Sequence, residues 1–286
     1  MGARRVVAVV TGLGLVAAFG YWLGHRQPEV PPPDSAPLGC AVEAGGAVHL
    51  DHEQMANAAT IAAVGVTQGM PDRAVVVALA TAMQESKLRN LPHLGEHNDH
   101  DSVGLFQQRP SQGWGTVEQV SDPRYASRQF YLALQRVPGW EEMRVTDAAQ
   151  RVQRSAYPEA YQRWADDATV LATALLGREP GAVTCRVPDQ PLAAGESAAS
   201  ALGELLTLDW GDQTAVALAS PPGVTVSAGD VDAGWRYAHW LVSHAAAHGV
   251  TRVHFDDLVW TAAESAWSPA ESAIDHVHAE VAGNPA

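Results

Sequence analysis

The sequence has few basic residues and almost no cysteine. Lys and Arg together number 18, against 32 Asp and Glu, and the formal net charge is −14. Binding of nucleic acid requires a basic face that neutralises phosphates, so this balance argues against a nucleic acid as partner. It also disfavours nonspecific attraction to an anionic surface. We therefore expect recognition to depend on uncharged hydrogen bonds and on stacking against some of the nine tryptophans and six tyrosines.

Only two cysteines are present, Cys40 and Cys185, and they lie far apart. The close spacing that zinc ligands usually show is therefore missing. Two cysteines at the two ends of one segment suit a disulfide in an oxidising compartment, with a pair of unpaired buried thiols as the alternative. In the chain-entropy model, closing a loop of this length would restrict the unfolded chain by about 5 kcal/mol.

The N-terminus carries an apolar segment. Arg4 and Arg5 precede Val6–Leu23, which has no charged residue. As a helix this segment would be about 27 Å long, just adequate for a bilayer core of about 30 Å. The positive flank predicts a cytoplasmic N-terminus. No Ala-x-Ala signal follows, so we expect an uncleaved signal anchor, with secretion after signal cleavage as the alternative.

We expect five segments along the chain. Residues 1–26 form the signal anchor, and 27–40 form a proline-rich, extended spacer. A mainly α domain occupies 41–186, a linker follows at 187–196, and a small α+β domain occupies 197–286. The predicted fold class is therefore a mainly α domain followed by a small α+β domain, behind an N-terminal transmembrane helix.

Apolar residues recur at three- and four-residue spacing through much of the first domain, which is typical of helices. This spacing predicts helices over Met55–Thr67, Pro71–Leu91, Pro123–Val137, Thr146–Gln153 and Tyr157–Leu176. The polar stretch from Pro92 to Trp114 predicts loops with a small hairpin. In the second domain we expect a helix over 234–249 and strands over 251–255 and 275–281.

Glu85 is the residue of most chemical interest. It stands near the end of an apolar helical run, and Gly104–Gln108, a glycine-led segment that ends in two glutamines, follows it. A lone glutamate in a helix is usually an ordinary solvated side chain. Burial beside Met83 and Leu88, however, would disfavour the ionised form and keep Glu85 protonated near neutral pH. It could then donate a proton to a glycosidic oxygen while the glutamine amides hold the sugars.

The order of these motifs resembles the lysozyme-like, soluble lytic transglycosylase superfamily in a form common among actinomycete cell-wall proteins. The similarity covers about Leu50–Leu176 and rests on the Glu85-Ser86 pair, on Gly104–Gln108 and on Ser155–Pro158. It implies a lysozyme-like fold that cleaves the MurNAc–GlcNAc β-1,4 bond of peptidoglycan with Glu85 as general acid and base. By the same matching, the expected substrate-binding residues are Ser86, Gln107, Gln108 and Tyr157.

A cluster of histidines and acids at His93–Asp101 permits two interpretations. Its spacing fits no established zinc pattern, so a metal site is the less favoured one. We expect it to form the rim of a sugar cleft, with Asp99 or Asp101 as a second carboxylate. At about 6.5–9.5 Å from Glu85, either one would activate a water for inverting hydrolysis. Otherwise Glu85 works alone and closes an anhydro ring on the muramic 6-hydroxyl, the route that the superfamily resemblance favours.

The C-terminal part contains a second set of histidines. Strand alternation places His276 and His278 on one face, where they are weak candidates for zinc ligands. The order of the elements resembles a D-alanyl-D-alanine-peptidase-like domain, but no histidine lies between Ser197 and Asp230. A further ligand would have to come from His239 or His254. We therefore expect a degenerate, noncatalytic module and no metal or other cofactor.

Together these features predict a single-pass membrane protein whose bulk is extracytoplasmic and which cleaves peptidoglycan as a glycosidase. Its expected partners are glycan strands and, through the N-terminal helix, the membrane, while protein partners remain undefined. Two alternatives stay open. One is a noncatalytic wall-binding or scaffold protein. The other is a zinc-dependent peptidoglycan peptidase that acts through the C-terminal domain.

Overall fold

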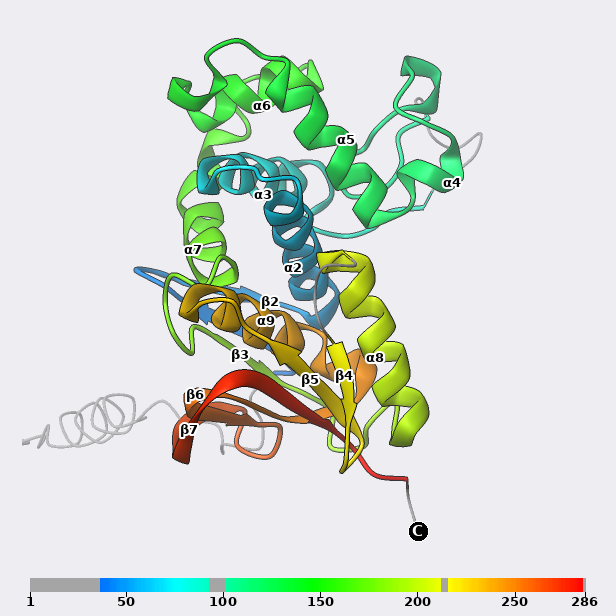
Figure 1. Ribbon diagram of the computed structural model, residues 1–286. Coiled ribbons are helices and arrows are strands. Elements are labelled where there is room, and N and C mark those ends of the chain that lie inside the picture. Colours follow the sequence, from blue (N-terminus) through cyan, green and yellow to red (C-terminus); the bar gives the residue numbers. More distant parts are fainter. Residues whose placement is uncertain (1–36, 93–100, 212–215, 285–286) are drawn as a thin grey trace, which may run out of the picture. The chain divides into compact units, whose positions relative to one another are not determined.

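The computed structural model describes residues 37–92, 101–211 and 216–284 (Figure 1). The predicted signal anchor and most of the predicted spacer lie outside these ranges, as does His93–His100. Within the described ranges, no helix combines the length and apolar character needed to cross a membrane.

A small three-stranded sheet carries both cysteines. Its strands β1 (Gly39–Glu43), β2 (Ala47–Leu50) and β3 (Val183–Arg186) lie in the order β2-β1-β3, and both pairings are antiparallel. Cys40 and Cys185 lie opposite each other in the β1–β3 register and form a disulfide, which confirms the predicted pairing. Every element between β2 and β3 therefore lies inside one covalently closed loop.

Helices fill this loop, as the apolar spacing predicts. Helix α2 (His52–Thr67) begins at a capping box in which the Asp51 side chain accepts from Gln54 N–H and the Gln54 side chain accepts from Asp51 N–H. The other helices are α3 (Asp72–Ser86), α4 (Val117–Val120), α5 (Pro123–Gln135), α6 (Val145–Gln153) and α7 (Ala165–Leu175), with single 3₁₀ turns at Pro110–Gln112, Trp140–Glu142 and Gln162–Trp164.

Helix α3 ends before the predicted Leu91. Lys87 and Leu88 have positive φ angles of 57° and 59°, so the chain leaves the helical path directly after Ser86. The N–H of Leu88 donates to the Ala82 carbonyl, which closes the helix as in a Schellman motif. Leu88 is completely buried after this turn. The turn places Glu85 in the last turn of α3.

Helix α7 also differs from its prediction, because it begins at Ala165 rather than at Tyr157. The preceding residues form turns and the 3₁₀ turn Gln162–Trp164 instead of a regular helix. This irregular stretch contains Tyr161, which lies against Glu85 as described below.

The C-terminal part is an antiparallel sheet with helices, so the chain is a mixed α+β protein whose helical region comes first. The sheet has the strand order β4-β5-β7-β6. Its elements are α8 (Gly195–Trp210), β4 (Val216–Ala219), β5 (Gly223–Ser227), α9 (Val231–Ser243), α10 (Ala245–His248), β6 (Val250–Thr261) and β7 (Ala266–Val281). Elements α8, β4 and β5 were not predicted from the sequence, and the expected helix over 234–249 is divided into α9 and α10.

Helices α8 and α9 join this sheet to the helical region, and Leu38–Ala286 form one compact unit. Helix α9 contacts α2 and α7 as well as β6 and β7, and Figure 1 shows it between α2 and the sheet. Asp209 of α8 is buried at this junction. It accepts hydrogen bonds of 2.8 Å from Thr60 of α2 and from Trp240 of α9, and it forms an ion pair of 2.6 Å with Arg124 of α5.

Candidate functional site

A cavity of about 950 Å³ opens beside the C-terminal end of α3. Its walls come from the last turn of α3, from the segment between residues 102 and 114, from α5, and from α6 with the residues that follow it. The polar and aromatic lining residues are Glu85, Ser102, Gln107, Arg109, Gln112, Trp114, Gln129, Arg136, Arg151, Gln153, Arg154, Ser155 and Tyr157. Of the described residues that line it, Glu85 alone carries a carboxylate.

The Glu85 carboxyl is half-buried and is held by a tyrosine. The Tyr161 hydroxyl donates to Glu85 Oε1 over 2.6 Å. Tyr161 is completely buried, and burial, together with the charge and hydrogen bond of Glu85, raises the pKa of its phenol above the ordinary value. The phenol therefore keeps its proton and acts as a fixed donor. This bond occupies one carboxyl oxygen of Glu85, and no donor from the described ranges reaches the second oxygen, which can accept from a ligand.

A second layer of contacts fixes the last turn of α3. Gln84 Oε1 accepts from Arg163 over 2.9 Å and from the Trp164 indole over 3.0 Å. The Lys87 ammonium lies 4.5 Å from the centroid of the Trp164 ring. Burial and the charge of Arg163 lower the pKa of Lys87, while the charge of Glu85 opposes them. These contacts tie the end of α3 to the 3₁₀ turn Gln162–Trp164. They are made by Gln84 and Lys87, which lie on either side of Glu85 in the sequence.

Tyr161 is not among the site residues predicted from the sequence. The predicted tyrosine, Tyr157, lines the cavity but lies at its rim, with 74% of the residue exposed. The sequence does contain a signal for Tyr161, because Ala160-Tyr161 is a second Ala-Tyr pair shortly after Ala156-Tyr157. Both pairs fit the motif equally well in sequence, and only the fold shows which tyrosine reaches Glu85.

Two of the expected substrate-binding residues are buried outside the cavity lining. Ser86 Oγ donates to the Leu105 carbonyl over 2.8 Å, and Gln108 Nε2 donates to the Ala126 carbonyl over 2.9 Å. These bonds fasten the Gly104–Gln108 segment to α3 on one side and to α5 on the other. Both side chains therefore shape the cavity wall from behind.

The glutamine before Gln108 does line the cavity. Gln107 has a positive φ of 47°, and its amide donates to the Gly104 carbonyl over 3.0 Å. Gly104 has a φ of 75°, and a Cβ there would lie 2.4 Å from the Val120 carbonyl oxygen, so only glycine fits. The expected hairpin is a single bridge between Val103 and Gln108 in the described part of this segment. The glycine thus allows the tight turn that brings Gln107 into the same cavity as Glu85.

The structure does not place Asp101 in the cavity lining. Its carboxylate accepts from Ser111 N–H over 2.6 Å, from Ser111 Oγ over 2.8 Å and from Arg109 Nε over 3.0 Å. The Ser111 N–H, with the Ser111 hydroxyl and Arg109, holds the pKa of Asp101 well below its usual range. Asp101 is thus an ionised anchor for Arg109. Asp99, the other candidate for a second carboxylate, lies outside the described residues.

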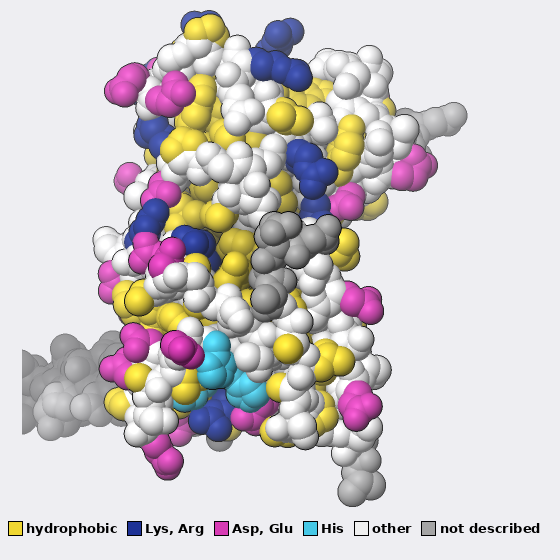
Figure 2. Space-filling view, in the orientation of Figure 1, with side chains coloured by type: hydrophobic (Ala, Val, Ile, Leu, Met, Phe, Trp, Pro, Cys, Tyr) yellow, Lys and Arg dark blue, Asp and Glu magenta, His cyan; other side chains and the backbone are white. Residues whose placement is uncertain are grey.

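The cavity is basic although the chain is acidic. Four arginines line it, namely Arg109, Arg136, Arg151 and Arg154. Figure 2 shows basic side chains over α5 and α6. This lining differs from the uncharged one that the net charge led us to expect, because net charge does not show how charges are distributed. Among the described tryptophans, Trp114 is the one that lines the cavity, and its half-buried ring offers a face for stacking on a sugar.

The histidines of the second sheet are engaged with neighbouring groups. Val277 is buried between His276 and His278 on β7, so the two histidines share the opposite face, as predicted. His278 Nδ1 lies 3.2 Å from the Thr225 hydroxyl, and His276 Nδ1 lies 3.0 Å from Asp275. Figure 2 shows histidines gathered over this sheet. Among the residues with described positions, no group of three or more His, Cys, Asp or Glu could hold a metal ion.

His239, considered above as a distant ligand, is completely buried in α9. Its Nε2 accepts from the Ala182 N–H over 3.1 Å, and its Nδ1 donates to the Ala174 carbonyl over 2.7 Å. Both ring nitrogens are therefore used, and the bonding partners fix the neutral tautomer. Burial lowers the pKa of His239 to about 4. The residue joins α9 to α7 and to the start of β3, and it has no lone pair left for a metal.

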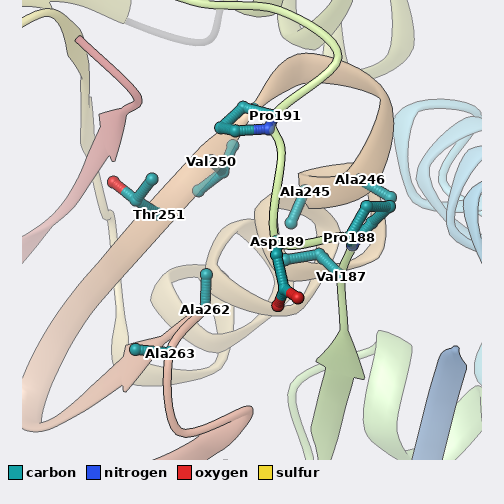
Figure 3. Close-up of a pocket in the computed structure, with 11 residues that line it drawn as sticks. Val187, Pro188, Asp189, Pro191, Ala245, Ala246, Val250, Thr251, Ala262 and Ala263 are labelled. Carbon is teal, nitrogen blue, oxygen red and sulfur yellow. The ribbon is translucent and has the colours of Figure 1, made fainter.

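A smaller pocket of about 280 Å³ lies between residues 187–191, α10 and β6 (Figure 3). Alanine, valine and proline make up most of its wall, and Asp189 is its one charged lining residue. It shares no lining residue with the Glu85 cavity. A single exposed carboxylate against an apolar wall lacks the paired polar groups that a reaction site needs.

No protein-family model matches this chain, and a comparison with curated proteins also found no match. The resemblance to lysozyme-like enzymes therefore stays a prediction from motifs, as does the resemblance of the C-terminal part to a peptidase fold.

Proposed function

We propose that this protein cleaves the β-1,4 bond between MurNAc and GlcNAc in peptidoglycan, with Glu85 as general acid and then general base. One observation supports this most strongly. A half-buried carboxyl, held by a buried tyrosine, is the one described carboxylate in the lining of a cavity of about 950 Å³. Such a cavity lies at the upper end of the range for small-molecule sites, about 300–1,000 Å³.

The proposed reaction needs one carboxyl group. Protonated Glu85 donates its proton to the bridging oxygen, and the bond from that oxygen to C1 of the muramic sugar breaks. The Glu85 carboxylate then takes the proton of the muramic 6-hydroxyl, whose oxygen bonds to C1 and closes an anhydro ring. Glu85 ends protonated, and no water is consumed. While Glu85 is ionised, the Tyr161 hydroxyl donates to the charged oxygen and stabilises it.

The uncharged lining residues supply the remaining functions of a sugar site. Gln107, Gln129 and Gln153 carry amides that donate to or accept from sugar hydroxyls. Trp114 provides an aromatic face for a pyranose ring. These groups position the glycan strand so that the scissile oxygen lies beside Glu85.

We further propose that the protein works outside the cytoplasm, anchored by residues 1–26. The Cys40–Cys185 disulfide supports an oxidising compartment. The uncharged run Val6–Leu23 and the preceding arginines support the anchor from sequence alone. The partners would then be the membrane and the glycan strands next to it.

Glu85→Gln tests the proposal, because the amide keeps the size of the side chain and loses the transferable proton. The full-length protein is incubated with purified peptidoglycan, and the released fragments are identified by mass. We expect wild type to release anhydro-muropeptides and Glu85→Gln to be slower by about 10²–10⁴-fold. Glu141→Gln is the matched control, because Glu141 is exposed in the same helical region and does not line the cavity.

The same digest separates the alternatives. Release by Glu85→Gln at the wild-type rate would contradict the proposed role of Glu85. Strands that bind to the wild-type protein without release of fragments would support a noncatalytic wall-binding protein. Stem peptides cut from intact strands would support a peptidase.

A further inference from the structure

We propose that Arg136, Arg151 and Arg154 form an anion subsite at one end of the Glu85 cavity, and that it binds the carboxylates of the peptide stems attached to the glycan. This inference rests on the proposed function, since it assigns a part of the same substrate. It adds that the protein prefers glycan strands that carry stems over bare strands.

The three arginines converge from the ends of two helices. Arg136 is the C-cap of α5, Arg151 lies in the last turn of α6, and Arg154 is the C-cap of α6. All three line the Glu85 cavity, and the same three also line an adjoining concavity of about 470 Å³. Val137 and Pro138 supply the apolar part of its wall. The positively charged concavity and the proposed reaction site are thus continuous.

These guanidinium groups are not neutralised by the part of the protein that the structure describes. Arg136 and Arg154 form no ion pair with any residue of described position. Arg151 lies within reach of the charge of Asp147, but the Asp147 carboxylate is held by Arg144 over 2.8 and 2.9 Å. All three arginines are exposed. By contrast, the fourth lining arginine is committed to Asp101, as described above.

Helix stability explains part of this arrangement. A basic side chain at the C-terminal end of a helix interacts favourably with the helix dipole, and Arg136 and Arg154 both occupy such positions. That effect does not account for three like charges around one concavity, because like charges repel one another, although water weakens the repulsion between exposed side chains. An anion that bridges the guanidinium groups removes the repulsion.

A peptide stem has the chemistry that this concavity fits. Stems are attached to the lactyl group of MurNAc, one of the two sugars at the scissile bond, and their acidic residues and C-termini carry free carboxylates. Guanidinium groups bind carboxylates through two parallel hydrogen bonds. Val137 and Pro138 offer an apolar surface for the methyl groups of stem alanines. A strand bound beside Glu85 would therefore place a stem next to the arginines.

The test measures binding, so that it does not depend on cleavage. Full-length Glu85→Gln protein is titrated with a GlcNAc–MurNAc tetrasaccharide that carries tetrapeptide stems, and with the same tetrasaccharide after removal of its stems. We expect tighter binding of the stem-bearing probe by at least about tenfold, decreasing with added salt. The double substitution Arg136→Gln and Arg154→Gln should remove this preference and leave the affinity for the bare probe little changed.

Arg128→Gln is the matched control, since Arg128 is exposed on the same helix α5 and does not line the cavity. Equal affinity of the protein for the two probes would overturn the inference. A preference for the stem-bearing probe that persists in the double variant would also overturn it. So would a loss of that preference in Arg128→Gln as large as the loss in the double variant. Displacement of the stem-bearing probe by a polyol phosphate polymer at lower concentration than by free stem peptide would also overturn it, in favour of a phosphodiester ligand.

The two proposals fail separately. An arginine-dependent preference in a protein that releases no fragments would support the subsite and contradict the enzymatic function. Cleavage that depends on Glu85 but proceeds equally on stem-bearing and bare strands would support the enzymatic function and contradict the anion subsite.

Discussion

Glu85 in the helical region and His239 beside the second sheet are both titratable residues shielded from solvent, but Glu85 faces a cavity and His239 holds parts of the fold together. Among the described residues, Glu85 receives one hydrogen bond, from the Tyr161 side chain, and it lines a cavity. His239 exchanges hydrogen bonds with two backbone groups and lines neither the Glu85 cavity nor the smaller pocket beside α10. A shielded titratable group is therefore a candidate for chemistry when an unused lone pair opens on space for a ligand. Without that access it is part of the framework.

The largest effect that we expect concerns the junction between the two regions. Asp209→Ala removes the nearer of the two carboxylates of Arg124, since Asp122 lies 3.7 Å away, and leaves Thr60 and Trp240 without their acceptor. Loss of one partner of a buried ion pair typically costs about 3–5 kcal/mol. We expect a decrease of this size in the free energy of unfolding, measured by urea denaturation, together with a loss of cleavage at temperatures where wild type is active.

Glu204→Ala is the control for this substitution, because Glu204 is an exposed acid on the same helix. It should change the free energy of unfolding by no more than about 0.5 kcal/mol. If Asp209→Ala were equally mild, the helical region would not depend on α8, and the two regions would be independent folding units.

A smaller effect is expected when the donor to Glu85 is removed. Tyr161→Phe deletes the hydroxyl that stabilises the ionised Glu85. A hydrogen bond to a charged group is worth about 1.5–3 kcal/mol, so kcat should decrease by roughly ten- to a hundredfold. KM should change little, because Tyr161 does not line the cavity.

Tyr157→Phe provides the matched comparison, because it removes the same hydroxyl from a tyrosine at the cavity rim. It should alter KM more than kcat. If Tyr157→Phe lowered kcat more than Tyr161→Phe did, the roles assigned to the two tyrosines would be reversed.

Much of the fold could be predicted from the sequence where local periodicity decides the structure. The helices around Glu85 follow apolar spacing, and the disulfide follows from two cysteines that bracket the helical region. Strands β1, β2 and β3 are only four or five residues long and are defined by pairing between distant segments, which periodicity does not reveal. Helix α8 begins at Gly195, shortly after Pro188 and Pro191, so its first residues fall within the linker that we expected at 187–196.

The site could be predicted only in part. Gln107 and Tyr157, which motif order grouped with Glu85, line the same cavity as Glu85, and their role in binding substrate stays a prediction. Motif order did not distinguish Gln107 from Gln108, because a single turn with a positive φ decides which of the two side chains reaches the cavity and which is buried. The basic lining also escaped prediction, because Arg136 and Arg154 belong to helices that are separate in sequence.

The effect that is smallest near neutral pH concerns the pH dependence of stability on the sheet side. In the unfolded chain His239 takes up a proton near pH 6.5, but in the native protein burial lowers its pKa to about 4. Between these values the unfolded state binds more protons, so the free energy of unfolding decreases as the pH falls from 6.5 toward 4. The contribution is about 1.4 kcal/mol for each pH unit within this window.

His239→Gln should therefore reduce the slope of unfolding free energy against pH in urea denaturations at several pH values. The buried His244, whose pKa burial also lowers to about 4, should maintain the rest of the slope. Equal slopes in wild type and His239→Gln would contradict the assignment of His239 to the framework.

The central claim is that Glu85 cleaves the glycan without a second carboxylate and without water. The most direct test is digestion of peptidoglycan by the full-length protein in water labelled with heavy oxygen, followed by mass analysis of the new muramic ends. We predict anhydro ends without label, produced by wild type and not by Glu85→Gln. Labelled reducing ends would contradict the single-carboxylate route, and the absence of any new muramic end would contradict the assignment as a glycosidase.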